Sequence, residues 1–216
     1  MDTVLIFAGG DLPDPNLADE LPVADLVLAA DSGYDVAVHL GVRVDVLIGD
    51  LDSVITSPIP DDVVIERYPV DKDQTDLDLA LELAMREDPS RVVVIGGTGG
   101  RFDHEISTIG LIGSDRWAGI DELDWVSPRG RAYVVRRRRI LHGDVGATVS
   151  LVPVGGPVTG LTTVGLQWEL EGDDFQHGTT RGVSNVMRGP VADVRIDSGC
   201  LLVVFPAIAS QRPVGS

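Results

Sequence analysis

The chain is poor in cysteine and lacks any long apolar run. Its 216 residues include one cysteine, Cys200, which excludes an internal disulfide and a cysteine-rich zinc site. No stretch of about 18 or more apolar residues occurs, so no membrane-spanning helix is expected. The N-terminus has no basic segment before its short apolar run, so we expect no signal peptide and a cytoplasmic protein.

Positive charge is also scarce. Sixteen arginines and one lysine, Lys72, face 34 acidic residues, and the formal net charge is −17. This charge argues against general nucleic-acid binding, which requires a basic surface. It also repels a nucleotide triphosphate at long range, although salt screens that repulsion beyond about 8 Å. A local cation and a few basic side chains could therefore still hold such a ligand.

The residues at 44–54 carry the strongest local signal. Val44–Ile48 is an apolar, mostly β-branched run typical of a buried parallel strand, and Asp50 and Asp52 follow it. An extended chain would point both carboxylates to one side, about 6–7 Å apart. Their repulsion of about 2–3 kcal/mol becomes a gain if a divalent cation binds between them. This pattern predicts a Mg²⁺ site for a phosphorylated substrate, and the alternative is that either aspartate caps a turn.

Two earlier strands should end at the same edge of the sheet. Residues 3–8 and 25–30 are apolar runs, the first followed by two glycines and the second by Asp31. The carboxyl ends of parallel strands share one edge, where open α/β sheets bind ligands. We therefore expect Asp31 to lie near Asp50 and Asp52.

Further elements follow from caps and periodicity. The expected set is a helix from Ser32 through about Leu40, a strand at 63–68, a helix after Thr75, a strand at 91–95 and a helix at 104–112.

A polar segment precedes the second of these helices. Thr75 is a predicted N-cap, and Asp76 and Asp78 fall in the first helical turn. Both could simply stabilise the helix dipole, at about 0.3–1 kcal/mol each. We accept that role for Asp78. For Asp76 a ligand role is equally open, because Lys72 and Gln74 crowd the same corner.

A glycine-rich segment follows the strand at 91–95. Such glycine density suits a backbone that wraps phosphate with its N–H groups, although no Walker A lysine follows. Arg101 could bind phosphate oxygens, with Asp103 orienting it or holding metal, or the two could form a structural ion pair. The glycine-rich segment consists of Gly96, Gly97, Thr98, Gly99 and Gly100.

After Gly113 the helical periodicity disappears. Short β-rich segments alternate with Gly and Pro turns, which predicts a smaller all-β domain such as a sandwich. We place the boundary at 118/119. The basic run Arg136–Arg139 favours a solvated edge strand, since arginine there discourages edge pairing. The expected strands are 122–126, 132–136, 147–152, 158–170, 179–187, 192–197 and 200–205.

Taken in order, these motifs resemble the thiamine pyrophosphokinase family along nearly the whole chain. Two positions depart from its usual pattern: Thr108 stands where an asparagine is common, and Glu169 replaces the proline of a Trp-Pro-Leu segment. The matching segments are Ala8–Asp11, Ala30–Gly33, Ile48–Ser53, Lys72–Asp78, Gly96–His104, Gly165–Trp168 and Val183–Asn185.

The resemblance implies a fold and a reaction. The fold would be an N-terminal Rossmann-like α/β domain with a mostly parallel sheet, residues 1–118, which binds ATP and Mg²⁺. A C-terminal all-β sandwich, residues 119–216, would bind thiamine and form the dimer. The resemblance implies a homodimer with active sites at the subunit interface. The thiamine hydroxyl would attack the β-phosphorus of ATP, giving AMP and thiamine diphosphate.

The resemblance also implies roles for individual residues. Asp76 is preferred over Asp31 as the acceptor of the hydroxyl proton. Trp168 would offer an aromatic face to the cationic thiamine, and its alternative role is an ordinary core tryptophan. The magnesium ligands would be Asp50, Asp52 and Asp76, within a catalytic set of Asp31, Asp50, Asp52, Lys72 and Asp76. ATP would contact Gln74, Thr75, Gly96–Arg101 and Asp103, while thiamine would contact Trp168, Ser184 and Asn185.

Three rival functions remain open from the sequence. A haloacid-dehalogenase-type phosphatase would use Asp50 as nucleophile and Asp52 as acid, but it needs a later lysine and none follows Lys72. A diphosphokinase for a pterin-type alcohol would share every ATP-side residue. A non-catalytic nucleotide-binding protein would not need so many carboxylates.

Overall fold

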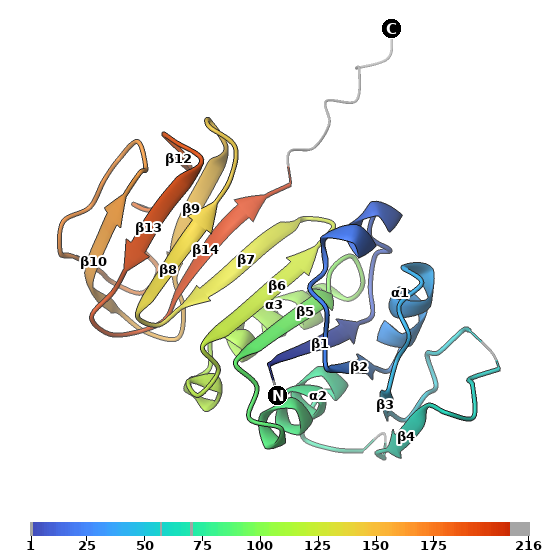
Figure 1. Cartoon of the computed structure of the whole chain (residues 1–216). Helices are drawn as coiled ribbons and strands as arrows, with labels where there is room; N and C mark the ends of the chain where they lie inside the picture. The colour runs from blue at the N-terminus through green and yellow to red at the C-terminus, as the bar shows by residue number, and fades with distance from the viewer. Residues whose placement is uncertain (1, 57, 70, 208–216) are drawn as a thin grey trace, which may run out of the picture. The chain divides into compact units, whose positions relative to one another are not determined.

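The structure, a computed structural model, describes residues 2–56, 58–69 and 71–207. Its contacts divide the chain into two compact units, Met1–Pro128 and Arg129–Ser216, called here the first and second units. Figure 1 shows helices in the first unit and an all-strand second unit. Among the described residues, no helix is long and apolar enough to cross a membrane.

The six strands described in the first unit pair with one another in parallel. The hydrogen-bonded order is β6-β5-β1-β2-β3-β4. This confirms the mostly parallel sheet expected from the apolar runs. The strands are β1 (Thr3–Ala8), β2 (Leu26–Ala30), β3 (Val46–Gly49), β4 (Val64–Arg67), β5 (Arg91–Gly96) and β6 (Glu122–Ser127).

The strand order reverses between β1 and β5. From β1 the chain adds strands outward to β4, and from β5 it adds β6 on the other side. Right-handed crossovers then place the helices of the two directions on opposite faces. In Figure 1, α1 lies on one face and α2 and α3 on the other. The helices are η1 (Pro15–Glu20), α1 (Gly33–His39), α2 (Asp76–Arg86), α3 (Phe102–Ile112) and η2 (Asp115–Trp117).

Both faces of the inner strands β1, β2 and β5 are buried, which explains their continuous apolar sequences. In β1, Leu5 and Phe7 belong to the core on the α1 side, while Val4 and Ile6 point to the opposite face. All four side chains are at most 3% exposed. Covered on both faces, the sheet holds the carboxyl ends of its strands at fixed positions.

The second unit is built from antiparallel strands. One set pairs in the order β12-β9-β14-β7 and the other in the order β11-β10-β13-β8. One buried cluster draws side chains from both sets, including Leu151 and Leu161. The strands are β7 (Gly130–Val135), β8 (Arg138–His142), β9 (Thr148–Pro153), β10 (Val158–Val164), β11 (Asp173–Phe175), β12 (Asn185–Val186), β13 (Val191–Arg195) and β14 (Leu201–Pro206).

Two long strands expected from the sequence are shorter in the structure. The strand expected at 158–170 ends at Val164, because Gly165 has φ +87° and its missing side chain admits the Val191 carbonyl. The strand expected at 179–187 is reduced to Asn185–Val186, since Ser184 has φ +63°. The first turn precedes the exposed Trp168, and the second precedes the buried Asn185.

The basic run lies partly in an edge strand, as expected. β8 begins at Arg138 and lies at the end of its sheet. Arg138 is exposed and pairs with Asp193, whereas Arg139 is buried and stacks on the Tyr133 ring at 5.3 Å. The strand therefore sends alternate arginines to opposite faces.

From the sequence, the strand at 122–126 was predicted to be the first strand of the β-rich half. In the structure β6 pairs in parallel with β5 and belongs to the first unit, which ends at Pro128. A parallel neighbour requires a crossover, and α3 with η2 supplies it. The division by contacts thus falls ten residues after the 118/119 boundary.

Candidate functional site

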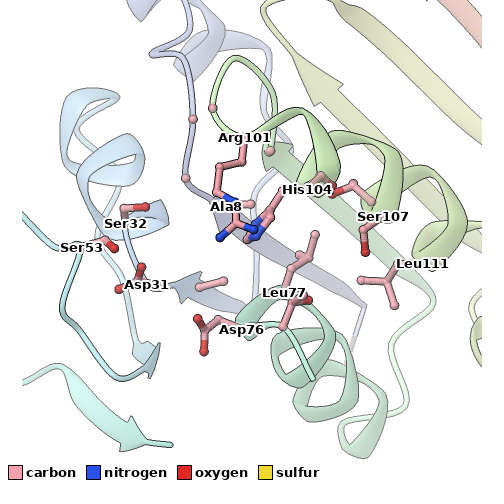
Figure 2. Close-up of a pocket in the computed structure, with 17 residues that line it drawn as sticks. Ala8, Asp31, Ser32, Ser53, Asp76, Leu77, Arg101, His104, Ser107 and Leu111 are labelled. Carbon is pink, nitrogen blue, oxygen red and sulfur yellow. Dashed lines mark hydrogen bonds between the residues drawn. The ribbon is translucent and has the colours of Figure 1, made fainter. Parts of the chain in front are cut away.

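A cavity of about 250 Å³ lies where the strand order reverses. Figure 2 shows Asp31 and Ser32 on one side of it, Asp76 and Leu77 from α2 below, and α3 on the other side. This is the crevice at which open α/β sheets bind ligands. Its lining residues are Ala8, Gly9, Gly10, Ala30, Asp31, Ser32, Ser53, Thr75, Asp76, Leu77, Gly97, Gly100, Arg101, His104, Ser107, Thr108 and Leu111.

Three aspartates gather beside this cavity. Asp31, Asp50 and Asp52 each offer a carboxylate oxygen, and these oxygens all lie within 4.8 Å of one another. The expected proximity of Asp31 to the pair is confirmed. Asp76 was predicted as the third metal ligand, but it does not belong to this group among the described residues.

The expected extended conformation of Asp50 to Asp52 is wrong. Leu51 has φ +68°, so the chain turns, and the Asp52 N–H donates to Asp50 Oδ1 at 3.1 Å. The Ser53 hydroxyl donates to Asp52 Oδ1 at 2.8 Å. Asp50 therefore caps a local turn and also joins the cluster. The turn keeps the carboxylates close, whereas an extended chain would separate them further.

The Asp31 carboxylate is partly buried and has an unfavourable environment. Burial raises the pKa of Asp31, and the neighbouring Asp76 and Asp50 carboxylates raise it further against opposing hydrogen bonds from Ser32 and Ser53. Its Oδ1 atom is buried and has no hydrogen-bond partner among the described residues. A buried carboxylate oxygen without a partner is the atom that a cation would satisfy.

Asp76 has a different partner. The only lysine of the chain, Lys72, donates to Asp76 Oδ1 at 2.6 Å, and the lysine side chain is 15% exposed. Its ammonium also lies 5.9 Å from the centre of the Tyr68 ring. A Cβ added at Gly49 would lie 3.2 Å from Asp76 Cγ and 3.3 Å from Asp31 Cβ. The glycine thus admits both carboxylates to the end of β3.

The glycine-rich loop closes against the end of β1. The Gly97 N–H donates to the Gly9 carbonyl at 3.0 Å, and the Trp125 indole donates to the Gly96 carbonyl at 2.8 Å. Gly96 has φ +93°, and a Cβ there would come within 2.1 Å of the Ala8 carbonyl oxygen. Only glycine fits this approach of two strand ends.

Arg101 and Asp103 form the ion pair that the sequence left as an alternative. Arg101 donates from Nε and Nη2 to the two carboxylate oxygens at 3.2 and 2.6 Å. Hydrogen bonds from Arg101 lower the pKa of Asp103. The pair is exposed, and Arg101 also lines the cavity. Arg101 is therefore part of the site although its guanidinium is paired with Asp103.

The residues at the start of α2 fall into two groups, those that line the cavity and those that support the helix. Thr75 lines the cavity and caps the helix by accepting from the Asp78 N–H at 3.2 Å, as predicted. Asp78 pairs with Arg116 at 2.9 Å, which fits the structural role expected for it. Gln74 donates to Glu82 at 2.8 Å, so its amide is engaged with the helix.

The sequence analysis missed one wall of the cavity. His104, Ser107, Thr108 and Leu111 all line it from α3. They follow the i, i+3, i+4, i+7 spacing of one helix face, a signal that the sequence does contain. Thr108, noted only as a departure from a pattern, donates its hydroxyl to the His104 carbonyl at 2.9 Å.

In the second unit, Trp168 is not a core tryptophan. Its side chain is 56% exposed. The Asn185 amide is buried and binds the Trp168 backbone twice, accepting from its N–H at 3.1 Å and donating to its carbonyl at 2.8 Å. Ser184 is exposed, and its N–H donates to the Ser150 hydroxyl at 3.0 Å. The turn thus presents an indole ring to solvent.

Known proteins match both units. Residues 17–116 match the family model of the thiamin pyrophosphokinase catalytic domain, and residues 137–201 match that of the thiamin pyrophosphokinase vitamin B1 binding domain. The chain belongs to the thiamin pyrophosphokinase family. Both models match in the order in which the two units follow one another.

Individual relatives agree with this assignment. The chain is 26% identical to the thiamine pyrophosphokinase of Bacillus subtilis, covering 94% of this chain and 98% of that protein. It is 30% identical to thiamine pyrophosphokinase 3 of Oryza sativa subsp. japonica, covering 74% of this chain and 64% of that longer protein. A crystal structure of the Bacillus subtilis thiamine pyrophosphokinase has the same fold, with a TM-score of 0.81, 23% identity and coverage of 95% and 99%.

Asp35 provides an electrostatic contrast to Asp31 on the neighbouring helix. Burial would raise its pKa, but the Thr56 side chain and the Ile55 and Thr56 backbone N–H groups lower it by a larger amount. The backbone bonds measure 3.0 and 2.7 Å. Asp35 thereby ties α1 to the segment that follows the aspartate turn.

Opposite effects of pH on stability are therefore expected for Asp31→Asn and Asp35→Asn. The raised pKa of Asp31 makes its carboxylate unfavourable above the unfolded value of 3.8, so Asp31→Asn should be more stable than wild type at pH 7 without divalent ions. The lowered pKa of Asp35 stabilises the fold above 3.8, so Asp35→Asn should be less stable at pH 7. Urea unfolding in chelator should show the Asp31→Asn difference shrinking as the pH falls from 7 toward 3.8, and the Asp35→Asn difference shrinking only as the pH falls below 3.8. Equal destabilisation by both substitutions would contradict this electrostatic account.

Proposed function

We propose that this chain transfers an intact diphosphate from ATP to thiamine, giving AMP and thiamine diphosphate. The observation that carries the proposal is the convergence of Asp31, Asp50 and Asp52 beside a glycine-lined cavity at the strand reversal. The family assignment points to the same reaction. It does not support the phosphatase, the pterin diphosphokinase or the non-catalytic nucleotide-binding alternative.

The reaction makes clear demands on the site. The thiamine hydroxyl oxygen forms a bond to the β-phosphorus, the bond from that phosphorus to the α–β bridging oxygen breaks, and AMP leaves. Such transfers depend mainly on positioning and on neutralising charge. Gly97 and Gly100 line the cavity without side chains, so a phosphate can approach their backbone. Arg101 lines it too, and Lys72 lies beside it on Asp76.

The donor set fits Mg²⁺. The cluster offers only carboxylate oxygens, which hard divalent cations prefer. The partnerless Oδ1 of Asp31 marks one ligand position. We infer that Asp31, Asp50 and Asp52 hold the ion, with Asp76 at its margin and not in the direct role predicted for it. A bound Mg²⁺ would compensate the negative charge that develops on the phosphates.

The acceptor of the hydroxyl proton should lie outside the proposed metal ligands. Asp31 lines the cavity and burial raises its pKa, but a Mg²⁺ ion held by Asp31 would engage the carboxylate that the proton has to reach. Asp76 also lines the cavity, lies outside the group of three and accepts a hydrogen bond from Lys72 at 2.6 Å. We therefore keep Asp76, the acceptor preferred from the sequence, for this role.

The thiamine contacts are proposed in the second unit. The exposed ring of Trp168 could stack on the cationic thiamine, a contact of about 0.5–2 kcal/mol. The exposed Ser184 could hydrogen-bond the aminopyrimidine. Asn185 makes two side-chain hydrogen bonds to the Trp168 backbone, so it also positions that ring. This assigns ATP and Mg²⁺ to the N-terminal domain and thiamine to the C-terminal one.

We also propose the finer architecture that the family resemblance implies. The order β6-β5-β1-β2-β3-β4 supports a Rossmann-like first unit, and the shared core of two antiparallel sets supports a sandwich in the second. A homodimer with active sites at the subunit interface would cover apolar surface on α3. There Phe102 and Ile106 are 74% and 55% exposed, close to the cavity wall.

Product analysis tests the reaction directly. Purified protein with ATP, Mg²⁺ and thiamine should yield AMP and thiamine diphosphate in equal amounts, and chelation of the metal should abolish both. Production of AMP with a pterin alcohol but not with thiamine would show that the acceptor is wrong. Free phosphate released without any acceptor would contradict diphosphate transfer altogether.

Asp50→Asn should abolish turnover while leaving the fold intact. The substitution keeps a turn-capping oxygen but removes the charge needed near the phosphates, so kcat should fall by about 10²- to 10³-fold. Steady-state kinetics and circular dichroism check both parts. The control Asp61→Asn removes an exposed carboxylate from the same half of the chain and should leave kcat unchanged. Near-normal turnover in Asp50→Asn would refute the metal assignment.

Trp168→Ala should weaken thiamine binding selectively. Loss of a cation–π contact of about 0.5–2 kcal/mol corresponds to a rise of about 2- to 30-fold in the KM for thiamine. The KM for ATP should stay constant, and the melting temperature should change little because the ring is half exposed. Val191→Ala, which trims another exposed apolar side chain of this unit, serves as control. Equal rises in both KM values would rule out the proposed thiamine contact.

A further inference from the structure

The glycine-rich loop has an inner and an outer side. Gly97 and Gly100 line the cavity, while Thr98 and Gly99 are not among its lining residues in the described chain. On the outer side, the Asp11 N–H donates to the Thr98 carbonyl at 2.6 Å. A Cβ added at Gly99 would fall within 1.8 Å of the Asp11 carboxyl carbon. The loop is therefore packed from behind by the segment that follows β1.

A second carboxylate fastens the outer side. Glu105 accepts from the Gly99 N–H through Oε1 at 2.5 Å. It lies in the first turn of α3, one residue after His104, which lines the cavity. Arg101, the N-cap of this helix, makes no side-chain capping bond within the described residues. Glu105 instead reaches back across the helix start and couples α3 to the loop.

Glu105 lies in the first turn of α3, where the helix dipole favours a carboxylate. Its Oε1 atom also occupies the N–H of Gly99, a loop residue that does not line the cavity. This hydrogen bond joins the helix start to the loop that presents Gly97, Gly100 and Arg101 to the cavity.

We propose that Glu105 is a positioning residue for ATP, acting through its hydrogen bond to Gly99. It holds the glycine-rich loop in the shape that directs Gly97, Gly100 and Arg101 into the cavity, and its negative charge is not what the site uses. The inference rests on the proposed function, since it takes the triphosphate of ATP as the ligand of this loop. It assigns Glu105 a role that the sequence motifs did not suggest.

Three substitutions separate the hydrogen bond from the charge. Glu105→Ala removes the acceptor and should raise the KM for ATP about tenfold, with kcat and the KM for thiamine nearly unchanged. Glu105→Gln keeps an acceptor for the Gly99 N–H but removes the charge, and should restore the KM for ATP to the wild-type value or below. Glu87→Ala removes an exposed carboxylate just after α2 and should change none of these constants.

Binding of a non-hydrolysable ATP analogue, measured by calorimetry with Mg²⁺, gives a readout independent of turnover. The same order of dissociation constants, with Ala weaker than Gln and wild type, supports the proposal. It is overturned if Glu105→Ala lowers only the melting temperature, or if Gln is as impaired as Ala. If wild type binds the analogue but does not transfer diphosphate to thiamine, the proposed function is wrong. The role of Glu105 in nucleotide binding is then still decided by these dissociation constants.

Discussion

Mutual repulsion of carboxylates is the constraint on which the site depends. Asp31, Asp50, Asp52 and Asp76 come together from two strand ends and a helix start, in a chain with excess negative charge. Local partners offset part of the repulsion, namely the Asp52 backbone N–H, the Ser53 hydroxyl and the Lys72 ammonium. The pKa of Asp31 is raised first by burial, and the neighbouring Asp76 and Asp50 carboxylates raise it further. An arrangement of this kind persists because the surrounding sheet is stable enough to impose it.

The sheet imposes it through topology. Strands buried on both faces cannot shift without exposing apolar side chains, so their carboxyl ends are fixed relative to one another. The reversal between β1 and β5 leaves a crevice between two diverging connections, and glycines at both strand ends let the backbone approach a ligand. Repulsive groups on one wall and a glycine-rich loop on the other then define one cavity. The fold thus places charge and backbone amides on opposite sides of the same space.

Much of this could be predicted from the sequence, because periodicity and caps are local signals. The β1 strand and the Thr75 cap were predicted correctly for that reason. The turn at Leu51 was not, since leucine gives no signal of a left-handed backbone and only the tertiary structure imposes it. The choice between Asp31 and Asp76 as the third metal ligand depended on the hydrogen-bond partner of each carboxylate.

Contacts distant in sequence explain the other differences. Asn185 binds the backbone of Trp168, 17 residues earlier, and no pattern in either segment predicts that pairing. Gly165 ends its strand because another strand carbonyl lies against it. The sequence of β6 resembles any short β segment and was grouped with the β-rich half, and only its pairing with β5 reveals a parallel neighbour. The α3 wall was different, since its spacing was present in the sequence.

Lys72 has one more consequence, which concerns covalent chemistry. Every other basic side chain besides histidine is arginine, so this is the one lysine side chain that acylation could neutralise. Acylation there would remove the ammonium from Asp76 and leave that carboxylate uncompensated beside Asp31. Because the chain has a single lysine, all of its sensitivity to lysine acylation would lie at the edge of its own cavity.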